Sequence, residues 1–268
     1  MMSEFNPIPT PEIEVTLESL PEIRQGIGQM REQKGKEEET LAEITRVLPK
    51  AIALGPNEHV VHLYWESHLV NQHLIMFELE KSDEERDVNV MDKALKEMEK
   101  ASLAADEYIT THNLANFKKE SHRFLGKVAD YKGDYPLAQR HYEEMAKLYE
   151  EIGHPRRLEA YAVLARVLIM QGRITEGIDL GRQTYQDFDQ SKDGIDLRNE
   201  DFSTWAVWKS GAATHVAQSL LATGEATFFK ETIIDWLLDA KKIVEDPRNS
   251  YRIRVGEIES LLERIQAL

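Results

Sequence analysis

The chain has 268 residues, of which 41% are hydrophobic and 30% charged, a composition typical of a folded soluble protein. Its formal net charge of −15 disfavours nucleic acid and anionic membrane surfaces as partners, because their phosphates attract basic proteins. Cysteine is absent, which excludes disulfides, thiolate catalysis and cysteine-ligated zinc. No apolar run is as long as a membrane span, and the N-terminus lacks the pattern of a signal peptide. We therefore expect a cytoplasmic protein.

Alternating prolines mark the start of the chain. Because proline lacks an N–H and disfavours a helical residue before it, we expect residues 1–11 to form a disordered Pro-rich tail. From residue 12 onward apolar residues recur with helical spacing, and no segment alternates as a strand does. The sequence predicts an all-α fold with helices over 21–33, 37–54, 57–81, 84–109, 113–132, 135–152, 155–171, 174–188, 202–222, 226–245 and 250–267.

The helical part divides into four segments. Residues 12–110 are expected to form N-terminal helical pairs of degenerate repeat character, and residues 111–188 two clear repeats. Residues 189–201 (DQSKDGIDLRNED) are polar and have no apolar stripe, so we expect a loop longer than most helix–helix connections. Residues 202–268 are expected to hold C-terminal helices that include a weak third repeat and a capping helix.

A pattern within residues 119–188 occurs twice with an offset of 39 residues. Glycine inside a helix costs up to about 1 kcal/mol relative to alanine, so glycines on the second helix of the later copy predict close contact between helices. The paired positions are Leu125 and Leu164, Gly126 and Ala165, Gly133 and Gly172, Tyr135 and Ile174, Ala138 and Gly177, and Tyr142 and Gly181.

This pattern resembles the tetratricopeptide repeat, in which each unit is a pair of antiparallel helices. The 39-residue period is similar to the longer repeats found in kinesin light chains and in bacterial peptide-sensing regulators. The resemblance implies a right-handed α-solenoid of about ten or eleven helices. It also implies an adaptor or sensor that binds a protein or peptide in its concave groove, with no catalytic residues and no cofactor.

The first helix of each repeat lines the groove in this family. Three of these positions are basic in an acidic chain, which would suit a peptide with an acidic side chain or C-terminus. The asparagines of the family's carboxylate clamp are missing here. The alternative is a solvated helix face with the intrahelical pairs Glu120–Arg123 and Lys127–Asp130. The candidate groove residues are Arg123, Phe124, Lys127, Tyr131, Arg166 and Met170.

A second set of candidates lies on the predicted helix 57–81. His59, His62, Glu66 and His73 fall within one sector of this helix, and imidazole and carboxylate groups are metal ligands. This leaves open an all-α metal- or small-ligand-binding protein or enzyme as the alternative function. Apolar residues share the same face, however, so packing is the simpler interpretation.

The last helix carries an apolar stripe that allows two interpretations. It could mediate self-association, or it could cap the solenoid of its own chain. The stripe consists of Ile258, Leu261, Leu262, Ile265 and Leu268.

Overall fold

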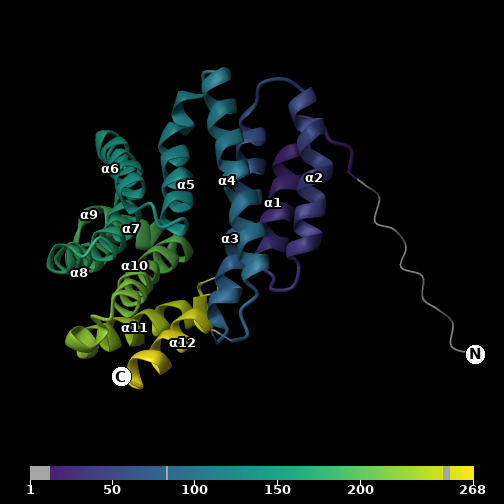
Figure 1. Cartoon of the computed structure of the whole chain (residues 1–268). Coiled ribbons are helices and arrows are strands. Elements are labelled where there is room, and N and C mark those ends of the chain that lie inside the picture. Colours follow the sequence, from purple (N-terminus) through teal and green to yellow (C-terminus); the bar gives the residue numbers. More distant parts are fainter. Residues whose placement is uncertain (1–12, 83, 250–253) are drawn as a thin grey trace, which may run out of the picture.

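A computed structural model describes residues 13–82, 84–249 and 254–268. Within these ranges the chain is helical and has no strand, which confirms the predicted all-α solenoid (Figure 1). The twelve α-helices are slightly more than the ten or eleven expected. None of them is long and apolar enough to cross a bilayer. The expected tail at residues 1–11 lies outside the described residues.

The elements follow one another with short connections. They are α1 (Leu20–Arg31), α2 (Glu37–Ala53), α3 (Glu58–Glu80), α4 (Val88–Thr111), η1 (Ala115–Phe117), α5 (Lys118–Tyr131), α6 (Tyr135–Glu151), α7 (Arg157–Met170), α8 (Ile174–Gln190), α9 (Lys192–Glu200), α10 (Phe202–Thr223), η2 (Ala226–Phe229), α11 (Lys230–Glu245) and α12 (Arg254–Gln266).

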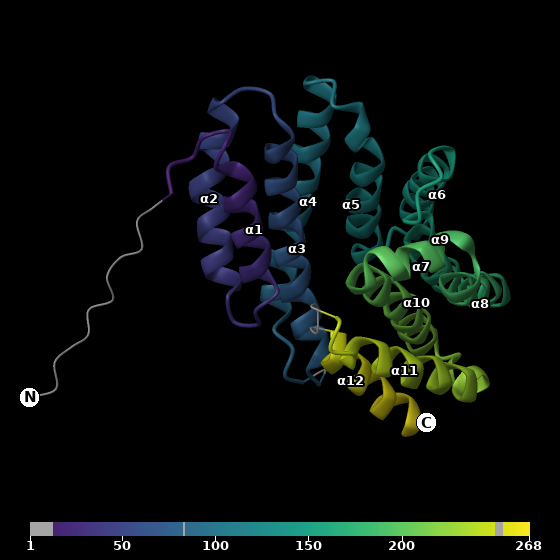
Figure 2. The same cartoon turned by 180° about the vertical axis from the view of Figure 1, so that it is seen from behind.

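The helices pack mainly against their neighbours in sequence and form a strongly curved array. Helices α1 to α4 stand side by side, α5 continues this row, and the chain then turns through α6 to α10 (Figures 1 and 2). The curvature brings the last helix, α12, back into contact with α3. The solenoid therefore closes on itself around the faces of α3, α5, α7, α10 and α12, which we call the inner helices.

The 39-residue period is visible in the helix boundaries. Helix α7 has the bounds of α5 moved by 39 residues, and α8 has those of α6 moved by the same distance. Each pair packs as an antiparallel hairpin, and α6 also packs against α7. The sequence repeat is therefore a structural repeat.

Glycines allow the close contacts within and between these hairpins. A Cβ atom added at Gly126 would lie 2.6 Å from the ring of Tyr142 on the partner helix. A Cβ at Gly177 would lie 2.7 Å from the carbonyl oxygen of Ala165, and one at Gly181 would lie 2.8 Å from Val216 on α10. The contact predicted from the two helix glycines is present.

The polar segment 189–201 is not a loop, which corrects the prediction. Ser191 caps α9 by accepting a hydrogen bond from the Gly194 N–H at 3.1 Å, and Asp201 caps α10 through the Thr204 N–H at 3.0 Å. A single apolar residue, Leu197, is buried against the main core. The two capping side chains and the buried Leu197 stabilise this nine-residue helix, although it has almost no apolar stripe.

The C-terminal stripe is used within its own chain. Its first four residues are buried in the core cluster formed with α10 and α11, whereas Leu268 is exposed. Trp205 and Trp208 belong to the same cluster. Helix α12 thus caps the solenoid, which was one of the two interpretations of the stripe.

The glycine contacts predict a difference between two alanine substitutions. Gly177→Ala should lower the free energy of unfolding by about 1 to 3 kcal/mol, because the new methyl group meets backbone atoms of α7. Gly26→Ala, with no atom within 4 Å of the new Cβ, should raise it by up to about 1 kcal/mol. Chemical denaturation measures both. Equal effects would contradict the contact.

Candidate functional site

The inner helices enclose a cavity of about 300 Å³. Residues of six helices and of the connection between α3 and α4 line it. The contributions include Gln72 from α3, Lys127 from α5, Arg166 from α7, His215 from α10 and Glu257 from α12. Because the cavity lies where the array closes, residues almost 200 positions apart in sequence share one wall.

The charge of this cavity is opposite to that of the chain. The whole sequence has 33 basic and 48 acidic residues, whereas the cavity has six basic and four acidic side chains. The acidic ones are Glu80, Asp130, Glu159 and Glu257, and the basic ones are Arg86, Arg123, Lys127, Arg166, Arg254 and Arg264.

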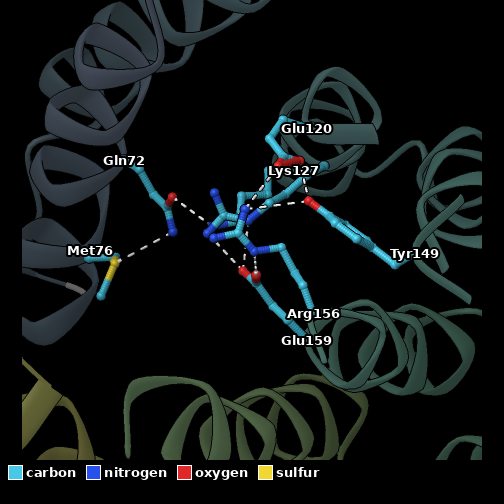
Figure 3. A network of polar contacts seen from close by, with 8 residues as sticks. Gln72, Met76, Glu120, Lys127, Tyr149, Arg156 and Glu159 are labelled. Carbon is cyan, nitrogen blue, oxygen red and sulfur yellow. Dashed lines mark hydrogen bonds and ion pairs between the residues drawn. The ribbon is translucent and has the colours of Figure 1, made fainter. Parts of the chain in front are cut away.

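An ionic network joins α5 to α7 on one side of the cavity (Figure 3). Arg123 contacts Glu159 at 2.7 Å, and Arg156 approaches the other oxygen of Glu159 at 3.5 Å. Arg156 also bonds Glu120 at 3.2 Å, and Glu120 accepts a hydrogen bond from the Tyr149 hydroxyl. Glu159 is buried, and the two arginines, with Lys127, hold its pKa below the usual range despite that burial.

Two further arginines are held by neighbouring carboxylates. Arg166 of α7 bonds Asp130 of α5 at 2.8 Å. Arg254 of α12 contacts Glu257 at 3.1 Å and donates to the Thr214 hydroxyl at 3.0 Å. These pairs fix the position of each guanidinium. Because a guanidinium has five N–H donors, the pairs leave donors available.

Lys127 differs from these arginines. Its only hydrogen bond among the described residues is to the Gln72 side-chain oxygen at 3.1 Å, and no described carboxylate lies within ion-pair distance. Figure 3 shows Gln72 reaching across from α3, with its amide nitrogen donating to the Met76 sulfur at 3.8 Å. Burial, followed by the neighbouring Arg123, lowers the pKa of Lys127 to about 7.

Three buried oxygen atoms of the cavity wall have no hydrogen-bond partner in the described part of the chain. They are Oδ1 of Asp130, the hydroxyl of Tyr142 and Oε2 of Glu159, the last of which lies 3.5 Å from Arg156. Buried polar atoms are normally paired, so Oδ1 of Asp130 and the Tyr142 hydroxyl are available to a bound molecule.

Four of the six predicted groove residues line the cavity: Arg123, Lys127, Tyr131 and Arg166. Phe124 does not. It is 2% exposed and stacks on Trp65 with ring centroids 5.1 Å apart, which places it in the core between α5 and α3. Met170 is half-buried and is also outside the cavity lining. Arg123 and Arg166 pair with carboxylates of the neighbouring inner helix, and Lys127 bonds Gln72. The intrahelical pairs Glu120–Arg123 and Lys127–Asp130 are therefore not formed among the described residues.

The residues of α3, α10 and α12 were missed as site residues. Their positions depend on the curvature of the whole array, and no local sequence pattern predicts that curvature. Basic residues on the inward face of α12 were the one available signal, because Arg254 and Arg264 flank the apolar stripe.

The histidine set on α3 does not come together as a metal centre. His59 contacts Arg24 at 2.9 Å, and Glu66 is bound by Arg31 at 2.7 Å, so two of the four face cations from α1. His62 packs edge-on against Trp65, and His73 is buried. Within the described residues, no three His, Asp or Glu side chains are placed to hold a metal ion.

No protein-family model matches this chain, and no curated protein matches it significantly. The tetratricopeptide assignment therefore remains a prediction from the repeat residues.

The buried network predicts a large cost for neutralising its centre. Glu159→Gln should lower the free energy of unfolding by about 3 kcal/mol or more, because two arginines lose their shared carboxylate. The matched control is Glu176→Gln, which breaks an exposed pair with Arg173 and should cost less than about 1 kcal/mol. Similar costs in denaturant titrations would show that the network contributes little.

His62 predicts acid sensitivity. Burial lowers its pKa from 6.5 to about 4, so the unfolded chain binds a proton between these values and the folded chain does not. The contribution of neutral His62 to the free energy of unfolding is complete above pH 6.5 and is lost as the pH falls toward 4. His62→Phe should therefore show a smaller dependence of unfolding free energy on pH across this window. A slope identical to that of the unmodified chain would contradict the assignment.

Proposed function

We propose that this chain is a non-enzymatic adaptor or sensor that binds the acidic part of a protein or peptide in its central cavity. The observation that carries the proposal is the reversed charge of the cavity within a strongly acidic chain. A desolvated cation without a counter-ion is costly, and an incoming carboxylate would offset that cost.

The arrangement of the cations supports carboxylate binding. Glu159 and Asp130 hold Arg123 and Arg166 in place before any ligand arrives. A guanidinium held in this way loses less side-chain entropy on binding, so its remaining N–H groups bind more favourably. The Lys127 ammonium, when protonated, has room for a carboxylate because no described acid occupies that position.

The size of the cavity limits the size of the ligand that it can hold. At about 300 Å³ it lies at the lower end of the range of ligand pockets, roughly 300 to 1,000 Å³. Contact between α12 and α3 closes one side of the solenoid. We therefore favour one side chain or the C-terminal residue of a partner over a long peptide lying along the array.

The proposal predicts the outcome of a binding measurement. Fluorescent hexapeptides ending in Asp or Glu should bind more tightly than the same peptides with amidated ends and Asn or Gln. Lys127→Met and Arg264→Glu should each weaken binding by about tenfold, as expected for loss of a charge-assisted contact. Fluorescence anisotropy at pH 6.5 and low salt measures these affinities.

The matched control is Arg182→Glu. Arg182 lies on α8 outside the cavity lining and pairs with Asp179, so this variant makes the same charge change as Arg264→Glu at a distance from the cavity. It should bind the acidic peptides like the unmodified chain. Equal binding of acidic and neutral peptides, or equal losses in the cavity and control variants, would refute the proposal.

A further inference from the structure

The four carboxylates of the cavity are all bound to cations other than Lys127. Glu159 is bound by Arg123 and Arg156, and Asp130 by Arg166. Glu257 is bound by Arg254, and Glu80 by Lys34 at 3.0 Å. Among the described residues, Lys127 therefore has no counter-ion, although the cavity wall contains four acids.

Three arginines near Lys127 oppose a positive charge on its side chain. Arg123 lies one turn earlier on α5, Arg156 precedes α7, and Arg254 approaches from α12. Glu159 of α7 acts in the other direction, but two arginines already neutralise it. On the α3 side, Lys127 donates a hydrogen bond to the neutral side-chain amide oxygen of Gln72 at 3.1 Å.

Lysines in such surroundings are nucleophiles, because desolvation and neighbouring cations favour the uncharged amine. We propose that Lys127 captures a small anionic carbonyl compound as an imine within the cavity. The uncharged Nζ attacks the carbonyl carbon, and a proton passes from nitrogen to oxygen to give a carbinolamine. Loss of one water then forms the C=N bond, and hydrolysis reverses the reaction without any oxidant or reductant.

The other features of the cavity define the class of ligand. An excess of cations favours a carbonyl compound that carries a carboxylate or phosphate group. The volume of about 300 Å³ admits a small molecule. The amide of Gln72 is oriented by its contact with Met76, so its oxygen accepts one Nζ hydrogen and leaves the nitrogen lone pair free (Figure 3).

The test uses glyoxylate as the probe and cyanoborohydride to reduce the imine to a stable carboxymethyl-lysine. At pH 7 an amine with a pKa of about 7 is about half uncharged, whereas an ordinary lysine is uncharged in roughly one molecule in 2,500. Peptide mass spectrometry should find Lys127 modified at least about tenfold faster than Lys100, whose side chain is 78% exposed. Propionaldehyde, which has no charge, should show a smaller preference for Lys127.

Two variants make the test specific. Lys127→Arg should abolish the fast modification and leave Lys100 unchanged. Arg123→Met removes a neighbouring cation and one partner of Glu159, so it should slow modification of Lys127, whereas Arg173→Met on the outer surface should not. The proposal is overturned if Lys127 reacts no faster than Lys100, or if Arg123→Met leaves its rate unchanged.

The inference concerns the same cavity as the proposed function but stands separately from it. Labelling uses the full chain without any peptide, so failure to label Lys127 leaves acidic-peptide binding intact. Loss of peptide binding with labelling retained refutes only the proposed function.

Discussion

The ionic pairs between α5 and α7 hold successive repeats together and make a buried basic surface possible. Arg123 and Glu159 lie 36 residues apart, as do Asp130 and Arg166, and both pairs join successive inner helices. Each pair buries a cation that would be costly alone and provides its counter-charge from the next repeat. The hairpins are thereby held in register by electrostatics on the inner side, while close glycine contacts hold the helices together elsewhere.

These pairs also explain how an acidic chain maintains a basic interior. Carboxylates outnumber cations over the whole sequence, yet each carboxylate in the cavity is already occupied. Lys127 therefore faces the cavity with no described carboxylate at ion-pair distance. The acidic remainder of the chain disfavours non-specific anions at the outer surface, and only a ligand that enters the cavity meets the positive side chains.

Much of the repeat region could be predicted from the sequence, because its information is local. Helical periodicity and turn glycines located α5 to α8, and helix phase placed Arg123, Lys127 and Arg166 on the inner side. Phe124 was assigned to the wrong side, because one residue corresponds to 100° around a helix and Trp65 of α3 covers that direction. The remaining cavity wall could not be predicted, because it arises from small rotations summed over the array.

The meeting of α12 with α3 has a mechanical consequence. A solenoid with free ends tolerates an error in any one helix–helix angle, since the ends simply move. Here the packing angles of all intervening helices add up at the contact between α12 and α3, which we call the seam. A change in any one of these angles therefore alters the seam. Gly181, whose missing side chain sets the approach of α8 to α10, lies far along the chain from that seam. A wider angle at Gly181 would separate α12 from α3 and change the cavity between them.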